Sequence, residues 1–164
     1  MIRYDYVKTR REDLKPYPEN TKGLSRLLIK TYTCINVWVY RMSSGRWMKT
    51  FPGGFPICLV TTTGAKSGKK RRIALIHLPL GEQKLLVASQ GGADTHPTWY
   101  HNVKAHPEVE IQTGAERRRY RARQVSDEEK RGLWPHLLSF YPAFDEYQAR
   151  TDRNIPVFVC EPMG

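Results

Sequence analysis

Short stretches of strand-type sequence, separated by turn residues, recur from residue 57 to the C-terminus and constrain the fold more than any other feature. Residues 57–60 form an apolar run of the kind that makes a buried strand. Further along, pairs of such stretches flank Gly81 and Gly114, which is the pattern of β-hairpins. The predicted strands cover residues 57–60, 72–80, 84–90, 108–113, 117–125 and 155–160.

Two helices are expected between these strands. His96-Pro97 is typical of a helix start, because proline is favoured in the first turn. Ser126 and Glu129 form a capping box that starts a second helix, which Pro135 and Pro142 bend or divide. Strands joined as hairpins, with few helices, predict a mainly β fold: a six-stranded antiparallel β-barrel with flanking helices.

The first 50 residues differ from the rest. Residues 1–20 are polar and contain two prolines, which predicts a mobile segment. Residues 22–40 have helical periodicity, with Leu, Ile and Trp near one face and a basic residue every four positions on another. Such a helix either packs on its own domain or a partner, or lies on an acidic membrane surface. We therefore expect residues 1–50 to be a flexible basic arm with an amphipathic helix. After a Gly-, Ser- and Pro-rich linker over 43–56, residues 51–164 form the domain.

Positive charge is concentrated in the N-terminal part of the chain. The sequence has 27 Lys and Arg against 16 Asp and Glu, but residues 1–72 hold 16 of the basic residues and only 4 of the acidic ones. Charge segregated in this way indicates an anionic partner. Nucleic acid, acidic lipid headgroups and a phosphorylated small molecule all satisfy this condition.

Residues 61–72 (TTTGAKSGKKRR) join the first two predicted strands and combine glycines, hydroxyl groups and cations. Backbone N–H groups in such a turn, with Ser and Thr donors and Lys or Arg charge, suit a phosphate. The alternative is a solvated basic hairpin tip. The spacing from Gly64 to Lys69 is one residue short of a Walker loop, and no long helix follows.

A second glycine-rich segment, residues 88–93 (ASQGGA), leaves a predicted strand and leads into the helix after Pro97. Flexible glycines followed by the N–H groups of a helix start suit the close approach of a flat ring or an anion. On neighbouring strands of one barrel, the two turns would form a single pocket.

Signatures of covalent and metal catalysis are absent from the sequence. No Gly-x-Ser-x-Gly motif occurs, and His96, His101 and His106 would lie on different faces of a helix, which argues against a metal site. If the protein is an enzyme, an organic cofactor would then carry out the reaction.

Residues 1–18 lack the apolar stretch of a signal peptide, and no apolar run reaches the ~18 residues of a membrane span. We therefore expect a cytoplasmic protein.

Four motifs occur in the order and spacing of a known family. They are Thr-Thr-Thr-Gly-x-Lys-Ser-Gly at 61–68, Ala-Ser-x-Gly-Gly-Ala at 88–93, His-Pro-x-Trp-Tyr-x-Asn at 96–102 and Asn-Ile-Pro-Val-Phe-Val-Cys-Glu-Pro at 154–162. Over residues 50–162 the chain closely resembles the deazaflavin-dependent nitroreductases of actinobacteria. The resemblance implies a split β-barrel and coenzyme F₄₂₀, an 8-hydroxy-5-deazaflavin with a phosphate and an oligoglutamate tail. It also implies hydride transfer to quinones or nitroaromatic compounds.

The resemblance further implies which residues bind the coenzyme. Its phosphate and carboxylates would contact the first turn, and its ring would lie against the second segment and the helix start. Position 90, where many relatives have Lys, is Gln90 here, and Trp99 is equally well explained as a core aromatic. The implied coenzyme-binding residues are Thr63, Lys66, Ser67, Gly68, Arg71, Ser89, Gln90, Gly91, Gly92, Ala93, Thr98, Trp99 and Asn102.

For the electron acceptor, the resemblance implies an aromatic face of Tyr141, Phe144 and Tyr147, with Ile76 in the same pocket. Phe144 stands where relatives have a tyrosine, so stacking is kept and one hydroxyl is lost. The proton that completes the reduction would come from Tyr147, Tyr141, Ser89 or solvent. Without the resemblance, the three aromatic residues would simply be core.

Two other functions remain open at this point. A non-catalytic deazaflavin carrier would have the same first pocket, and a nucleic-acid-binding barrel would use residues 69–72 and the arginines of 117–123. If residues 22–40 bind an anionic membrane, the protein would lie at the inner face of the cell membrane and meet a lipid-soluble quinone there.

Overall fold

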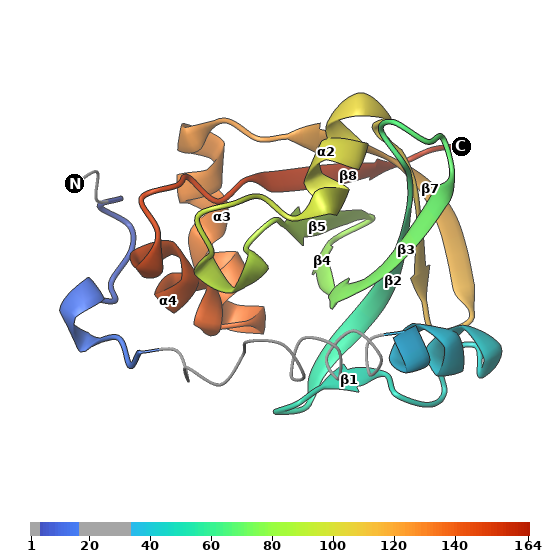
Figure 1. Cartoon of the computed structure of the whole chain (residues 1–164), viewed down its shortest axis with the longest axis horizontal. Helices are drawn as coiled ribbons and strands as arrows, with labels where there is room; N and C mark the ends of the chain where they lie inside the picture. The colour runs from blue at the N-terminus through green and yellow to red at the C-terminus, as the bar shows by residue number, and fades with distance from the viewer. Residues whose placement is uncertain (1–3, 17–33) are drawn as a thin grey trace.

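The computed structural model describes residues 4–16 and 34–164, in which a curved β-sheet is flanked by helices (Figure 1). Residues 34–42 are helical. The other elements, in chain order, are η1 (Arg11–Asp13), β1 (Thr50–Phe51), β2 (Phe55–Thr63), β3 (Lys70–Ile76), β4 (Leu78–Leu80), β5 (Gln83–Val87), η3 (Gln90–Gly92), α2 (Thr98–Ala105), β6 (Glu108–Thr113), β7 (Glu116–Gln124), α3 (Asp127–Phe140), α4 (Ala143–Arg150) and β8 (Val157–Pro162).

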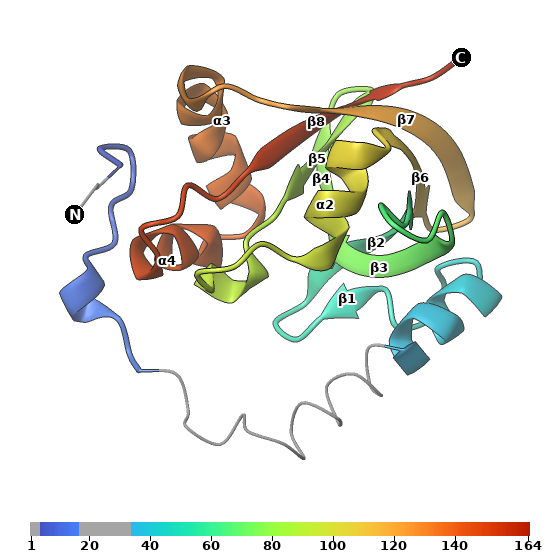
Figure 2. The same ribbon diagram turned by 45° about the horizontal axis from the view of Figure 1, so that its top comes forward.

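The strands form one antiparallel sheet with the order β1-β2-β6-β7-β8-β5-β4, and β3 also pairs with β2. Residues 59–61 of β2 pair with both β3 and β6, so β3 lies on the edge of β2 that faces away from β6. β3 and β4 are thus at the two ends of the sheet, yet only His77 separates them in the chain. The sheet therefore curls until its ends meet, and Figure 2 shows the curved strands from a second direction.

The prediction of a mainly β, antiparallel fold with flanking helices is confirmed, but the count of six strands is wrong. The predicted strand over 72–80 is divided at His77 into β3, which pairs with β2, and β4, which pairs with β5. One straight strand cannot serve both ends of a curled sheet. A further strand, β1, was not predicted. It pairs with the start of β2 around Gly53 and Gly54, in a stretch whose composition predicts only a linker.

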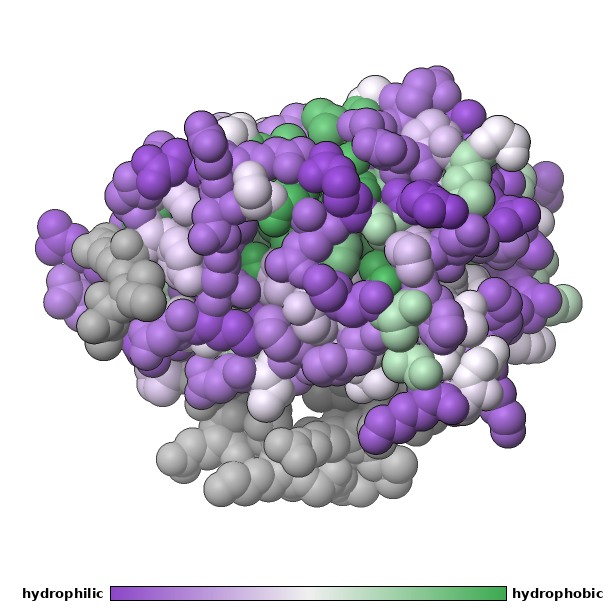
Figure 3. Space-filling view, turned by 90° about the horizontal axis from the view of Figure 1, so that it is seen from above, coloured by the Kyte–Doolittle hydropathy of each residue, from purple (hydrophilic) through white to green (hydrophobic). Residues whose placement is uncertain are grey.

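Two large apolar clusters fill most of the interior. One includes Val60, Trp99 and Phe158 and lies between α2 and the sheet, and the other includes Leu85 and Trp134 and lies between α3, α4 and the sheet. In the second half of β7, buried Tyr120 and Ala122 alternate with exposed arginines, so this strand turns its basic side chains to solvent. Hydrophilic side chains cover most of the face seen in Figure 3, and the most apolar ones appear in gaps between them.

The two helices begin where the sequence predicts, but the second is divided at only one of its two prolines. Ser126 caps α3, because its Oγ accepts a hydrogen bond from the N–H of Glu129 (3.1 Å). α3 continues through Pro135, since burial of Trp134 and Leu137 outweighs the loss of one backbone hydrogen bond. The chain is divided only at Pro142, which precedes α4.

Residues 4–16, which we call the N-terminal segment, lie beside α3 and α4 (Figures 1 and 2). Val7 is buried in the second cluster. The carboxylate of Asp145 on α4 accepts hydrogen bonds from the N–H groups of Lys8 (3.1 Å) and Thr9 (2.7 Å). The N-terminal segment thus packs on the domain, a contact that its composition does not predict because its partners lie more than 130 positions away in the chain.

Packing also crosses the predicted boundary at residue 50. The Tyr40 hydroxyl accepts a hydrogen bond from the N–H of Gly114 (2.8 Å) and donates one to the carbonyl of Ile57 (3.3 Å). Tyr40 is 1% exposed and belongs to a third, smaller cluster with Leu59 and Ala74. Residues 22–33, which make up most of the predicted amphipathic helix, lie outside the described residues.

Candidate functional site

The turn between β2 and β3 is shaped by its own hydrogen bonds. The N–H of Gly64 donates to the carbonyl of Lys69 (2.9 Å), and the N–H of Gly68 donates to the carbonyl of Gly64 (2.9 Å). Gly68 has a φ of 65°, in the left-handed region that favours glycine. The Ser67 hydroxyl accepts a weaker bond from the N–H of Lys69 (3.3 Å). Turn formation therefore leaves the cationic side chains of residues 66–72 exposed.

Asn102 fastens this turn to α2. Its side chain is buried, its Oδ1 accepts a hydrogen bond from the N–H of Ala65 (3.0 Å), and its Nδ2 donates to the Thr62 hydroxyl (3.2 Å). The predicted coenzyme-binding residue Asn102 thus lies in the site, but its amide is engaged in holding the turn in place. The effect is to fix the basic turn relative to the helix start.

A cavity of about 820 Å³ lies between the turn and α2. Three cations, Lys66, Arg71 and Arg72, line it together with the Ser67 hydroxyl. We call it the basic cavity. Because the cations share one hollow and face no carboxylate along its lining, the basic cavity attracts an anion.

The second glycine-rich segment makes a tight turn after β5. Gln90, Gly91 and Gly92 have φ values of 47°, 65° and 81°, so three successive residues adopt the left-handed region. This conformation costs free energy for Gln90, which has a Cβ. A Cβ at Gly92 would lie only 2.6 Å from the carbonyl oxygen of Tyr147, so glycine alone lets this turn approach α4 so closely.

A second cavity, of about 650 Å³, lies between this segment, β3 and α4. Apolar side chains form most of its walls, and they come from β1, β3, β4, β5, α2 and α4. We call it the apolar cavity. Its volume is within the range of about 300–1,000 Å³ that is common for small-molecule sites.

The two cavities meet at three residues, Ile73, Thr98 and Trp99, which line both. Thr98 and Trp99 are the first residues of α2, so the positive end of this helix is at the junction. Trp99 is also 5% exposed and packs in the first cluster. Trp99 therefore both packs in the core and lines the two cavities.

Polar groups enter the apolar cavity at a few points. The hydroxyls of Tyr141 and Tyr147 are 3.1 Å apart, within hydrogen-bond distance of each other. The ring of Phe144, which is buried, meets the Tyr141 ring edge-on at 5.0 Å between centroids. Ser89 and Ile76 line the same cavity. The predicted acceptor-side residues are thus brought together around one space.

Four of the predicted coenzyme-binding residues do not line either cavity: Thr63, Gly68, Gly92 and Ala93. Thr63 accepts a hydrogen bond from the Lys70 ammonium (2.9 Å), and the other three shape the two turns. The predicted residues that do line the cavities are Lys66, Ser67, Arg71, Ser89, Gln90, Gly91, Thr98, Trp99 and Asn102.

Sequence reasoning missed two parts of the site. Phe51 and Pro52 of the β1–β2 hairpin line the apolar cavity; aromatic residues on either side of Pro52-Gly53-Gly54 were the available signal. Arg153 was missed as well. Its guanidinium donates to the carbonyls of Ala88 (3.2 Å), Ser89 (3.0 Å) and Ala93 (3.0 Å), and its only signal in the sequence is its position beside the motif at 154–162.

His96 lies between these supports and α2. Its Nδ1 is 2.9 Å from Arg153 Nη1, and its ring stacks on Tyr100 with 4.2 Å between centroids. Burial, and then the positive charge of Arg153 and the neighbouring His101, lower the pKa of His96 below its usual value. His96 is therefore neutral at neutral pH, and Nδ1 is the acceptor that Arg153 requires.

Comparison with known proteins places this site in a family. The model of the F₄₂₀H₂-dependent quinone reductase family matches residues 32–162, which include both cavities. The chain belongs to this family. As a member it is an oxidoreductase that uses coenzyme F₄₂₀ to reduce quinones, and the resemblance inferred from the four motifs is confirmed.

Related proteins agree with this membership. The chain is similar to an F₄₂₀H₂-dependent quinone reductase of Mycobacterium tuberculosis, with 40% identity over 125 residues that cover 74% of this chain and 83% of the relative. A solved F₄₂₀-H₂ dependent reductase (FDR-A) is 47% identical and has a TM-score of 0.61, covering 65% of this chain and 94% of its own. A second solved structure, described as a domain-swapped dimer, is 36% identical with a TM-score of 0.64, covering 85% of this chain and all of its own.

Proposed function

We propose that this quinone reductase holds coenzyme F₄₂₀ across the junction of its two cavities and receives the quinone in the apolar cavity. The observation that carries the proposal is the shared lining at Ile73, Thr98 and Trp99, where a basic hollow opens into an apolar one. A coenzyme with a flat ring and an anionic tail fits this pair of environments. A site with only one of them would hold half of the molecule.

The basic cavity holds the phosphate and carboxylates. Lys66 and Arg71 supply charge-assisted hydrogen bonds, and Ser67 supplies a hydroxyl. Asn102 acts indirectly, because its amide keeps the turn against α2. Thr63, Gly68, Gly92 and Ala93 likewise act by shaping the turns that carry the contacting residues.

In the apolar cavity the chain orients the reactants and excludes water. Bound coenzyme F₄₂₀ supplies a hydride in a two-electron transfer. The Tyr147 or Tyr141 hydroxyl, or that of Ser89, gives a proton to the oxygen of the reduced acceptor. Because either tyrosine can donate in the 3.1 Å contact, a proton lost by one can be replaced from the other, which then takes a proton from solvent. Ile76 and Phe144 provide apolar contact for a planar acceptor, quinone or nitroaromatic.

A titration tests this assignment. Oxidised coenzyme F₄₂₀, flavin mononucleotide and nicotinamide adenine dinucleotide phosphate are added in turn to the full chain, and binding is followed by fluorescence. Only the deazaflavin is expected to bind tightly, because its ring and tail match the two cavities. Preferential binding of flavin mononucleotide would contradict the assignment and leave the fold untouched.

We place the nucleic-acid alternative second, because most arginines of β7 have acidic neighbours. Four arginines of β7 form ion pairs with acidic neighbours: Arg118 with Glu82, Arg119 and Arg121 with Glu108, and Arg123 with Glu129. These carboxylates reduce the positive charge that the strand offers to a phosphate backbone.

We further propose that the surface patch of Ile35, Trp38, Met42 and Trp47 lies on an anionic membrane. These side chains are 50%, 65%, 68% and 71% exposed, respectively, and basic residues lie between them in the sequence. Trp47 precedes the cavity residue Phe51 by four positions, which brings the apolar cavity close to a lipid-soluble quinone. Within residues 4–16 and 34–164, none of the helices has the length and apolar character that crossing a bilayer requires.

Substitution within the patch tests the membrane proposal better than deletion of residues 1–50, which would also remove Val7 and Tyr40 from the core. Trp38→Ser with Trp47→Ser is expected to reduce sedimentation with acidic vesicles at low ionic strength, and Ala105→Ser, at an exposed and uncharged position outside the patch, is the control. If the unaltered protein ignores acidic vesicles, the membrane proposal is wrong.

A further inference from the structure

Arg153 links the chain after α4 to the segment that lines the apolar cavity, although Arg153 itself lines neither cavity. Its Nη1 and Nη2 donate to the carbonyls of Ala88 and Ser89 at the start of that segment. Its Nε donates to the carbonyl of Ala93 at the end (3.0 Å), and Nη1 also meets His96. One planar guanidinium therefore holds both ends of residues 88–93.

The segment needs such a support because its conformation is costly. Gln90 at φ 47° is followed by two glycines with positive φ, and strained backbone of this kind persists only where the surroundings impose it. Ser89, Gln90 and Gly91 line the apolar cavity. The position of this wall therefore depends on hydrogen bonds made from the opposite side of the segment, away from the cavity.

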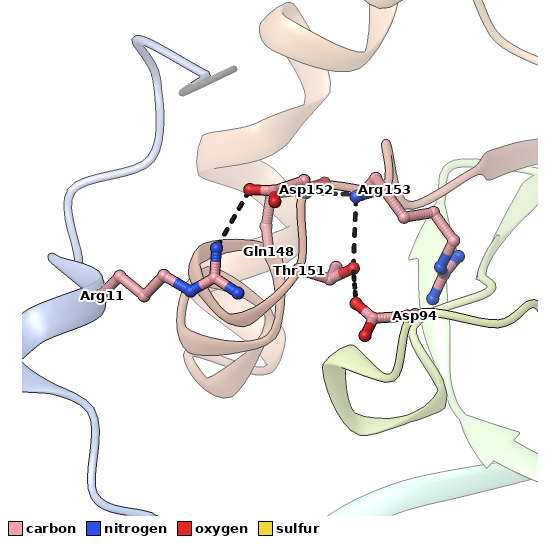
Figure 4. A network of polar contacts seen from close by, with 6 residues as sticks. All are labelled: Arg11, Asp94, Gln148, Thr151, Asp152 and Arg153. Carbon is pink, nitrogen blue, oxygen red and sulfur yellow. Dashed lines mark hydrogen bonds and ion pairs between the residues drawn. The ribbon is translucent and has the colours of Figure 1, made fainter. Parts of the chain in front are cut away.

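The same region fixes the opposite wall. Gly92 is packed so closely on α4 that an added Cβ would be 2.6 Å from the Tyr147 carbonyl oxygen and 3.0 Å from its Cα. The Thr151 hydroxyl at the end of α4 donates to Asp94 (2.8 Å) and accepts from the N–H of Arg153 (3.2 Å), a network drawn in Figure 4. Backbone contact at Gly92 and the hydrogen bonds of Arg153 thus set one wall of the cavity against the other.

We propose that Arg153 is a positioning residue for hydride transfer: with Gly92, it fixes the separation between the wall at Ser89–Gly91 and the tyrosine wall of α4. The proposal rests on the proposed function, in which the coenzyme ring lies against the first wall and the acceptor against the second. Transfer rates depend steeply on such a separation, and a misplacement of about 1 Å can cost roughly a hundredfold. Binding of the anionic tail depends on other residues, at the β2–β3 turn.

The test compares Arg153→Lys with Arg119→Lys. A lysine keeps the charge at position 153, but its single ammonium cannot reach both ends of the segment. Arg119 is exposed on β7 in an ion pair with Glu108, so Arg119→Lys controls for the exchange itself. Each variant is loaded with F₄₂₀H₂, and its oxidation by menadione is followed in a single turnover, beside the coenzyme Kd and the melting temperature.

Arg153→Lys is expected to slow the single turnover at least tenfold while its coenzyme Kd changes less than threefold, and Arg119→Lys is expected to match the unaltered protein. A folded Arg153→Lys protein with an unchanged turnover rate would overturn the proposal, as would a loss confined to the Kd. Gly92→Ala is the second variant, for the case that Arg153→Lys does not fold. It too is expected to slow the single turnover at least tenfold and to change the coenzyme Kd less than threefold. If the unaltered protein itself fails to oxidise F₄₂₀H₂, it is the proposed function that has failed.

Discussion

The basic cavity is formed by residues 62–73 and the first turns of α2, whereas the apolar cavity draws its walls from β1, β3, β4, β5, η3, α4 and the start of α2. In the basic cavity, the chemistry and the turn that presents it belong to the same short stretch of sequence. In the apolar cavity, side chains that face one another come from distant parts of the chain. Their positions depend on supports outside the cavity, chiefly Arg153 and Asp145.

Mutations in the two regions should therefore have different consequences. The cations of the basic cavity are exposed, so removing one changes coenzyme affinity and leaves stability nearly unchanged. The supports of the apolar cavity are buried or half-buried, so removing one changes stability or turnover and leaves the affinity for the anionic tail nearly unchanged.

The largest effect is expected at Asp145. Its buried carboxylate accepts hydrogen bonds from the N–H groups of Lys8 and Thr9 and from Trp134 Nε1 (3.0 Å). Asp145→Ala leaves these donors without an acceptor and should lower the free energy of unfolding by about 3 kcal/mol, measured by urea denaturation. Asp152→Ala, which removes only an exposed ion pair with Arg11, is the control and should cost less than about 1 kcal/mol. Equal losses in the two variants would mean that Asp145 is no special support.

A smaller effect, on rate alone, is expected at the tyrosine wall. Tyr147→Phe removes one hydroxyl of the Tyr141–Tyr147 pair and should slow menadione reduction roughly ten- to a hundredfold, the worth of one hydrogen bond to developing charge. The coenzyme Kd should not change. Phe144→Tyr adds a hydroxyl to the same wall and should raise turnover of nitroaromatic acceptors. If Tyr147→Phe lowers only the melting temperature, the aromatic residues are core packing and the proton has another source.

The smallest effect is expected from pH. The folded-state pKa of His96 is lowered by burial and by Arg153 and His101, while Tyr100 stacks on its ring. The unfolded chain therefore binds a proton first, and stability present above about pH 6.5 is lost as the pH falls through the lower folded-state pKa. Because His96 is partly exposed and solvent screens its charge, the loss should be small. Burial also lowers the pKa of His77, so urea denaturation at pH 7.5 and pH 5 should show a smaller loss in His96→Gln than in the unaltered protein. An identical pH response in both would exclude His96 as a source.

The same contrast explains what could be predicted from the sequence. The basic turn was predictable because its glycines, hydroxyls and cations are contiguous and shape themselves through local bonds. The division of one predicted strand at His77 was not, since it follows from closure of the whole sheet. The packing of the N-terminal segment on Asp145 and the role of Arg153 depend on partners far away in the chain, which no local pattern reveals.

The central claim is that the two cavities hold two parts of one coenzyme. It is tested most directly by measuring the Kd of coenzyme F₄₂₀, and of the same deazaflavin without its phosphate and glutamates, for the unaltered protein, Lys66→Ala and Lys69→Ala. Lys66 lines the basic cavity and Lys69, in the same turn, does not. Lys66→Ala is expected to weaken F₄₂₀ binding by about 1.5–3 kcal/mol and to leave the shortened ligand unaffected, with Lys69→Ala close to the unaltered protein for both. Equal losses for the full and the shortened ligand, or no loss for either at low salt, would contradict the claim.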